Sequence, residues 1–330
     1  MMTATASAQL RSGISLADLD TSVRPADDFY EYACGGWMKA HPLPAAYARY
    51  GSFDRLAEDN NKRINEILKE LQSNTYPEGS VEQKLSDLYK LAMDSARRDR
   101  EGVEPLMPVL RRLEAAKTKE QLFQEQLMLM PYGESELFYT YIAADEKNAS
   151  QNILNIIQGG LTLGQKDYYL ETDEATTKIR EGYKRYIVRM FQLFGFKKSA
   201  AEKKMKNIMK VETALAKASK SRTELRDPEA NYNKMTLKEF AARYPHLQLE
   251  QQMNAKGIKS LYLQELVVGQ PTFLDAADKL FASMTAAEYR DVMEWGQIEG
   301  AAGCLSDEVR QASFDFHGKV FSGKTEDHPL

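Results

Sequence analysis

Apolar residues recur at three- and four-residue steps along most of this chain, which is the spacing of one face of an α-helix. Between residues 53 and 71 they alternate with Glu, Lys and Asn on the other face. The pattern returns near residues 85–92, 106–113 and 119–130. Further helices are predicted at residues 172–195, 199–219, 236–243, 272–283, 286–301 and 306–322. The chain is therefore predicted to be mainly α-helical.

The periodicity changes between residues 136 and 158. Two short runs of β-branched and aromatic residues, 137–142 and 153–157, flank the polar segment 145–150. Short β-prone runs around a polar turn are typical of a β-hairpin. No internal repeat and no low-complexity linker divides the chain. We therefore predict a mainly α fold with a small β-hairpin near residues 136–158.

The composition is that of a globular protein, with 330 residues, 43% hydrophobic and 28% charged. The net charge is -4, and Lys and Arg alternate with acidic residues in helical phase, as on solvated helix faces. We therefore predict no nucleic-acid partner and no anionic-membrane partner. No run of 18 apolar residues occurs, so no transmembrane segment is predicted.

The N-terminal residues 3–9 are small and polar, and Ala6-Ser7-Ala8 has the small-x-small form after which signal peptidase cleaves. The sequence lacks the charged and long apolar regions of a complete signal peptide. Residues 1–8 are therefore either the remaining end of a signal peptide or a flexible tail. We favour the first interpretation, which predicts an exported protein in the periplasm, at the cell surface or outside the cell.

The four histidines do not have the spacing of a zinc site. No two of His41, His246, His317 and His328 lie four residues apart, so this sequence contains no HExxH helix. The sequence also lacks a G-x-S-x-G elbow and a P-loop. We therefore predict no catalytic residue and no metal ligand within these 330 residues.

The two cysteines, Cys34 and Cys304, are too few for a disulfide scaffold and lack a zinc-binding spacing. Whether they pair with each other stays open, because their distance is not set by the sequence. Gly35-Gly36 is predicted to form a two-glycine turn rather than a phosphate-binding loop. Asp27-Asp28 is predicted to cap the start of a helix.

Four sequence blocks resemble the neprilysin-like zinc endopeptidases, which include neprilysin, endothelin-converting enzyme and bacterial oligopeptidase O. The first block, residues 20–56, contains a DFY run, an A-C-G-G-W segment, a proline-flanked loop and R-Y-G-x-F-D. The others are G-L-x-L-x-x-x-D-Y-Y at 160–169, D-P-x-x-x-Y-N-K-M-T at 227–236 and F-D-F-x-G-K-x-x-S-G at 314–323. They follow the order of the family and span nearly the whole chain.

The resemblance implies a fold and an activity. Family members have two mostly helical lobes around a closed chamber, and the catalytic lobe holds zinc on HExxH and ExxxD helices, which are absent from this sequence. By this resemblance, residues 9–58 belong with the catalytic lobe and residues 59–330 form an incomplete helical covering lobe. The chain is then the N-terminal half of a secreted zinc metalloendopeptidase that cleaves small peptides. Zinc is bound only in the full-length enzyme, by a missing C-terminal catalytic half, and this chain alone is inactive.

The resemblance also implies three substrate-binding residues. Arg49 is similar to a family arginine that faces the C-terminal side of a bound peptide, and a guanidinium group matches both oxygens of a carboxylate. Phe53 and Asp54 match positions that line the same subsite. The family arginine three residues further on is Ala57 here, which weakens a preference for free C-termini. A structural salt bridge is the alternative role for Arg49. Cys34 matches a cysteine that bonds to the C-terminal half in animal relatives.

A second interpretation belongs to another class of protein. The chain can be a stand-alone, non-catalytic helical module that binds peptides or proteins, from which the peptidase half was lost. The DNA downstream of codon 330 distinguishes the two interpretations, since a reading frame that continues to HExxH supports the peptidase.

Overall fold

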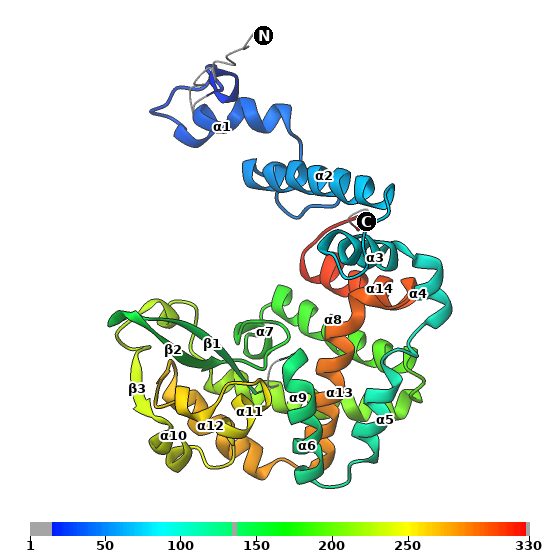
Figure 1. Ribbon diagram of the computed structural model, residues 1–330. Coiled ribbons are helices and arrows are strands. Elements are labelled where there is room, and N and C mark those ends of the chain that lie inside the picture. The colour runs from blue at the N-terminus through cyan, green and yellow to red at the C-terminus, as the bar shows by residue number, and fades with distance from the viewer. Residues whose placement is uncertain (1–14, 134–136, 328–330) are drawn as a thin grey trace, which may run out of the picture. The chain divides into compact units, whose positions relative to one another are not determined.

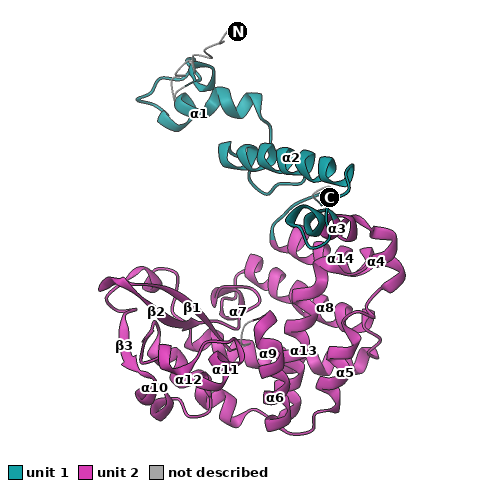
Figure 2. Ribbon diagram, in the orientation of Figure 1, with its two compact units in different colours: residues 1–86, 322–330 teal, residues 87–321 magenta. Residues whose placement is uncertain are grey.

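The computed structural model describes residues 15–133 and 137–327. The predicted end of a signal peptide at residues 1–8 and His328 lie outside the described residues. The chain divides into two compact units, which Figure 2 distinguishes by colour. Unit 1 comprises residues 1–86 and 322–330, and unit 2 comprises residues 87–321.

Unit 1 contains the 3-10 turn η1 (Leu16–Asp18), the helices α1 (Phe29–Ala40) and α2 (Ser52–Gln72), and the start of α3 (Val81–Met93). Helix α1 begins after Asp28, whose side chain accepts a hydrogen bond from the backbone N–H of Glu31 at 2.9 Å. The predicted capping role of this acidic pair is thus confirmed for Asp28.

The predicted turn at Gly35-Gly36 is wrong, because both glycines lie inside α1. Their lack of a side chain serves a close contact instead. A Cβ atom on Gly36 would lie 2.4 Å from the carbonyl oxygen of Ala17 and 2.7 Å from that of Leu19. The glycine therefore lets the backbone at residues 17–19 approach the helix, where only hydrogen fits.

Unit 2 contains most of the helices and all four strands that the described residues form (Figure 2), and Figure 1 labels these elements. The helices are α4 (Ser95–Glu101), α5 (Met107–Ala115), α6 (Lys119–Leu129), α7 (Asp167–Leu170), α8 (Glu174–Leu193), α9 (Lys198–Ala218), α10 (Leu237–Arg243), α11 (Leu249–Ala255), α12 (Pro271–Ser283), α13 (Ala286–Ala301) and α14 (Asp307–Phe314). Short 3-10 turns occur at Met130–Tyr132, Glu224–Arg226, Ser260–Tyr262 and Ala302–Cys304. The mainly α prediction is confirmed.

The four strands form one sheet in the order β1-β2-β4-β3. Strands β1 (Phe138–Asp145) and β2 (Asn148–Gln158) pair antiparallel, which confirms the predicted hairpin. Strand β4 (Glu265–Val268) pairs parallel to β2 and antiparallel to β3 (Asn233–Thr236). Sequence analysis missed β3 and β4, because four residues are too few to show a period of two.

The hydrophobic core lies in unit 2 and joins the helices to the sheet. Helix α13 is buried along much of its length, and α9 packs against it. The buried Lys204 of α9 donates to Asp291 at 2.8 Å and to Glu294 at 2.5 Å, both on α13. Burial raises the pKa of Glu294 to about 7. An ion cluster therefore links the two helices within the apolar core.

The helix predicted at residues 306–322 continues from α14 into a wider π-helical segment, η6 (Asp315–Phe321). A Cβ atom on Gly318 would lie 2.1 Å from the ring of Phe314. The glycine therefore makes room for that ring, and this packing accompanies the change from α- to π-helical winding.

Candidate functional site

Aromatic rings organise the connection between α1 and α2. The ring of Trp37 stacks on His41 and on Tyr50, with centroids 4.5 and 6.0 Å apart. Tyr47 meets Tyr50 edge-on at 5.0 Å. The hydroxyls of both tyrosines donate to the carboxylate of Glu58 on α2, at 2.8 and 2.9 Å. These contacts attach the loop before α2 to the helix itself.

The predicted substrate residues lie in the loop before α2 and in the first turn of that helix. Arg49 is exposed and makes no hydrogen bond or ion pair with the described residues, so the alternative of a structural salt bridge has no partner there. The side chain of Phe53 is 85% exposed. Asp54 is half-buried, and its Oδ2 accepts the backbone N–H of Gly51 at 2.9 Å. Asp54 thus caps α2, whereas Arg49 and Phe53 have no structural role in the described chain.

The described histidines are each engaged in ordinary contacts. The Nδ1 of His41 lies 3.0 Å from the carbonyl oxygen of Trp37. His246 contacts Asp278 at 2.8 Å, and His317 contacts Glu299 at 2.6 Å.

Residues 15–133 and 137–327 contain no group of three or more His, Cys, Asp or Glu side chains that could hold a metal ion. The described residues therefore do not fit a zinc site. Cys34 is half-buried, Cys304 is exposed, and both are free thiols in this structure.

A buried carboxyl group accepts hydrogen bonds from polar side chains of the family block at residues 160–169. The Oε1 of Glu212 on α9 accepts the hydroxyls of Thr162 at 2.8 Å and Tyr183 at 2.9 Å. Its Oε2 accepts the hydroxyl of Tyr169 at 2.6 Å. The indole N–H of Trp295 donates to the Tyr183 hydroxyl at 2.8 Å. Glu212 could not be singled out from the sequence, because nothing in the helical pattern of α9 marks its buried environment.

Burial raises the pKa of Glu212 to about 7, because the surrounding core disfavours its charged form. Burial is also the largest cause that raises the pKa values of Tyr169 and Tyr183 well above their ordinary value, and the negative charge of Glu212 is the second. Three hydroxyl donors offset part of this effect at Glu212. The network joins the segment after β2 to α8 and α9, and we assign it a structural role.

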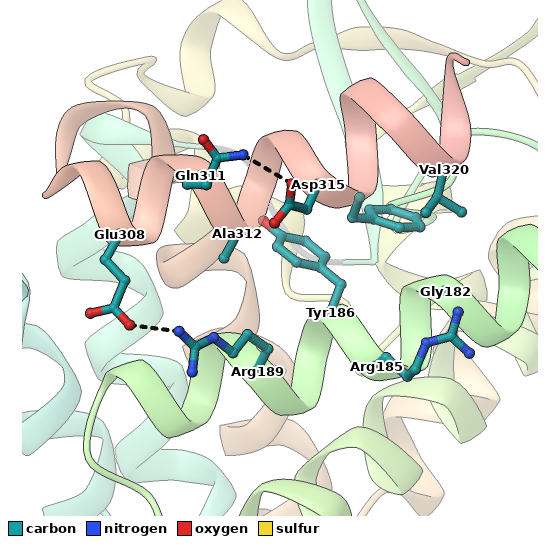
Figure 3. Close-up of a pocket in the computed structure, with 10 residues that line it drawn as sticks. Gly182, Arg185, Tyr186, Arg189, Glu308, Gln311, Ala312, Asp315 and Val320 are labelled. Carbon is teal, nitrogen blue, oxygen red and sulfur yellow. Dashed lines mark hydrogen bonds and ion pairs between the residues drawn. The ribbon is translucent and has the colours of Figure 1, made fainter. Parts of the chain in front are cut away.

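A pocket of about 410 Å³ lies between α8 and the segment formed by α14 and η6 (Figure 3). The rings of Tyr186 and Phe316 stack with centroids 5.1 Å apart. Arg189 donates to Glu308 at 2.5 Å, and Gln311 donates to Asp315 at 2.9 Å. Because these polar groups satisfy one another, the pocket by itself points to no particular ligand.

None of the helices in the described parts of the chain combines the length and apolar character that crossing a membrane requires.

Comparisons with known proteins agree with the resemblance. The sequence matches the model of Peptidase family M13 over residues 25–330. It is 28% identical to human endothelin-converting enzyme 1 over 318 residues, covering 94% of this chain and 41% of that protein. It is 31% identical to rat endothelin-converting enzyme-like 1 over 248 residues, covering 70% and 31%.

The structure is similar to a crystal structure of the Mycobacterium tuberculosis zinc metalloprotease ZMP1 in complex with an inhibitor. The TM-score is 0.89 at 26% identity, over 96% of this chain and 48% of that chain. PepO from Lactobacillus rhamnosis HN001 has a TM-score of 0.76 at 19% identity, over 93% and 48%, which supports the fold alone. The chain spans 41% of the length of human endothelin-converting enzyme 1. Because the family match covers residues 25–330, this chain belongs to peptidase family M13.

Proposed function

We propose that this chain is the N-terminal part of an exported zinc metalloendopeptidase that cleaves small peptides. Residues 9–58 belong with the catalytic lobe, and residues 59–330 form a helical lobe that restricts the substrate chamber. Zinc is held by a C-terminal catalytic half outside these 330 residues. The observation that carries the proposal is the family match over residues 25–330, together with coverage of 41% of a full-length relative.

In this proposal, Arg49 binds a carboxylate on the C-terminal side of the peptide. Its exposed guanidinium group has no partner among the described residues, and planar guanidinium groups match carboxylates with two parallel hydrogen bonds. The exposed ring of Phe53, four residues further along the chain, offers an apolar contact. Asp54 supports the site by fixing the first turn of α2 through its bond to Gly51.

The bare apolar surface of α2 supports the assignment of this segment to a larger structure. No residue of α2 is buried, although the helix is strongly amphipathic. Phe53, Leu56, Ile64 and Ile67 are each more than half exposed. Exposed apolar residues on one face of an amphipathic helix are typical of a contact with further polypeptide. In the proposal, that polypeptide is the catalytic half.

The role of Arg49 is tested in an enzyme that contains this chain together with its catalytic half. Short quenched peptides are compared with a free C-terminal carboxylate and with a C-terminal amide. Arg49→Ala is expected to raise KM for the free acid about 10- to 100-fold, since a charged hydrogen bond contributes about 1.5–3 kcal/mol. Arg63→Ala removes an exposed arginine inside α2 and is expected to leave both KM values unchanged. Equal effects of Arg49→Ala on acid and amide would contradict the proposed role.

The proposal that zinc and catalysis belong to the C-terminal half has a separate test. The purified 330-residue chain is expected to lack stoichiometric zinc and to leave a short quenched peptide intact. Tight zinc binding with turnover would refute the proposal. A stop codon directly after codon 330, with peptide binding but no hydrolysis, would favour the stand-alone binding module. Export is checked by fractionating the native cells.

A further inference from the structure

Helices α8 and α9 concentrate positive charge that the chain as a whole does not have. Together they contain eleven Lys and Arg and four Glu, a net charge of +7, whereas the whole chain carries -4. The two helices pack against each other in unit 2 (Figure 1). One glutamate, Glu212, and one lysine, Lys204, are buried, so the residues of these helices that reach the surface carry the same net charge of +7. The structure thus combines two mixed-charge segments into one basic surface.

A groove of about 510 Å³ runs along this surface between the two helices. Five cationic side chains line it: Arg180 and Lys184 from α8, and Lys206, Lys210 and Lys217 from α9. The groove contains no acidic lining residue and no aromatic lining residue. It is therefore a concave site with a single sign of charge, which attracts anionic groups.

Three of the five cations already have partners. The guanidinium of Arg180 donates to the carbonyl oxygens of Tyr168 and Glu171, at 3.1 and 2.8 Å. Lys184 donates to Glu181 at 2.7 Å, and Lys210 forms an ion pair with Glu288 of α13. These contacts hold the walls of the groove in place.

The remaining two cations, Lys206 and Lys217, are exposed and make no hydrogen bond or ion pair with the described residues. They lie eleven residues apart on the groove side of α9. At about 1.5 Å per residue, this places them about 16 Å apart along the helix axis. An extended polypeptide covers that distance in about five residues.

The chemistry of the groove favours an acidic polypeptide over other anions. Helices that insert into membranes present large apolar side chains, and α8 and α9 expose none. Sites for single-stranded nucleic acid stack bases on aromatic rings, which this groove lacks. Carboxylates on a flexible chain need only separated ammonium groups and a groove of matching length.

We propose that the groove between α8 and α9 is a docking site for an acidic polypeptide segment, with Lys206 and Lys217 binding its carboxylates. The proposal goes beyond the peptidase function and does not depend on it. The occupant is an acidic segment of a separate protein partner, recognised by its charge. Its carboxylates replace water at two ammonium groups that the protein itself leaves unpaired.

The test measures binding of fluorescein-labelled octaglutamate to the 330-residue chain by fluorescence anisotropy, with octaglutamine as the uncharged probe. Octaglutamate is expected to bind at 50 mM salt and to be released at 300 mM, because exposed ion pairs are screened. Lys206→Gln with Lys217→Gln is expected to weaken binding about tenfold. Lys238→Gln with Lys279→Gln, two exposed lysines outside these helices, removes the same charge and is expected to change binding less than twofold.

Two further measurements separate the groove from general charge effects. Bound octaglutamate is expected to protect Lys206 and Lys217, but not Lys238 and Lys279, from acylation in the unmodified chain. Circular dichroism checks that the variants fold. Equal loss of binding in both double variants, or equal protection of all four lysines, would overturn the proposal. Tighter binding of single-stranded DNA or phosphatidylserine vesicles than of octaglutamate would overturn the choice of ligand.

Discussion

Replacing the buried Glu212 by Gln is expected to remove a large part of the pH dependence of the stability of unit 2. The carboxyl group lies on α9 and accepts hydroxyl groups from Thr162, Tyr169 and Tyr183. No cation lies among these hydrogen-bond partners. Its ionisation is therefore opposed by burial, with only neutral donors to offset the loss of water.

The magnitude follows from the two pKa values. The ordinary pKa of the group is 4.5, and burial raises it to about 7 in the folded chain. Because the folded state binds the proton more tightly, the full stability is present below pH 4.5. Between pH 4.5 and 7 the unfolded chain loses the proton first, so stability falls as the pH rises. At about 1.4 kcal/mol for each pH unit, the total loss is roughly 3 kcal/mol, and it is complete above about pH 7.

Urea unfolding between pH 4.5 and 8.5 measures this effect. Trp295, whose indole N–H donates to Tyr183, reports on unit 2 when Trp37, the other tryptophan, is replaced by Phe. In that background, the unfolding free energy is expected to fall by roughly 3 kcal/mol less between pH 4.5 and 8.5 in the Glu212→Gln variant than in the chain that keeps Glu212. The buried Glu294 contributes its own pH dependence to both proteins, so it cancels in the comparison. Identical pH profiles with and without Glu212 would refute the reasoning.

Two further substitutions test packing and the buried charges. Gly36→Ala is expected to destabilise α1 by about 1–3 kcal/mol, because the new Cβ meets backbone atoms of residues 17–19. Gly300→Ala in α13 is the control, since its Cβ meets nothing within 4 Å and the helix is expected to gain up to about 1 kcal/mol of stability. Hydrogen exchange of the amides in each helix measures both, and equal effects would contradict the packing argument. Lys204→Ala is expected to cost about 3–5 kcal/mol, because it leaves two buried carboxylates without their cation. The exposed neighbour Lys203→Ala is expected to change the urea midpoint little, and an equally small change at Lys204 would show that the cluster adds no stability.

The long helices could be predicted from the sequence because local signals mark both their faces and their ends. The prediction at residues 286–301 coincides with α13 (Ala286–Ala301). The reason is a capping box, in which Thr285 accepts the N–H of Glu288 while Glu288 accepts the N–H of Thr285. Such contacts lie within three residues, so the sequence contains all of the information needed.

Features that depend on distant partners could not be predicted in this way. Strand β4 is four residues long, and its parallel pairing with β2 joins segments more than a hundred residues apart. The glycines of α1 have the sequence pattern of a turn, and only the approach of residues 17–19 explains why a residue without a side chain is needed at Gly36 inside a helix. The basic groove likewise results from packing α8 beside α9, whereas the linear sequence shows mixed charges.

The four family blocks have different physical roles, and this difference bears on where the substrate site is proposed. Residues 160–169 supply Thr162 and Tyr169 to the buried carboxyl group of Glu212. Residues 227–236 include Tyr232 and β3, and the Tyr232 hydroxyl donates to the buried Asp145 at 2.7 Å.

The block at residues 314–323 forms the π-helical segment, whose Val320 packs so closely on α8 that a Cβ atom on Gly182 would lie 2.8 Å from its Cγ1. Packing and hydrogen bonding within the chain therefore account for these three blocks. The R-Y-G-x-F-D part of the first block, residues 49–54, differs, since Arg49 and Phe53 are exposed and contribute nothing visible to folding. Where packing and hydrogen bonding do not explain the residues of a family motif, binding of a ligand is the simplest physical reason for them. The proposed substrate subsite therefore rests on residues 49–54.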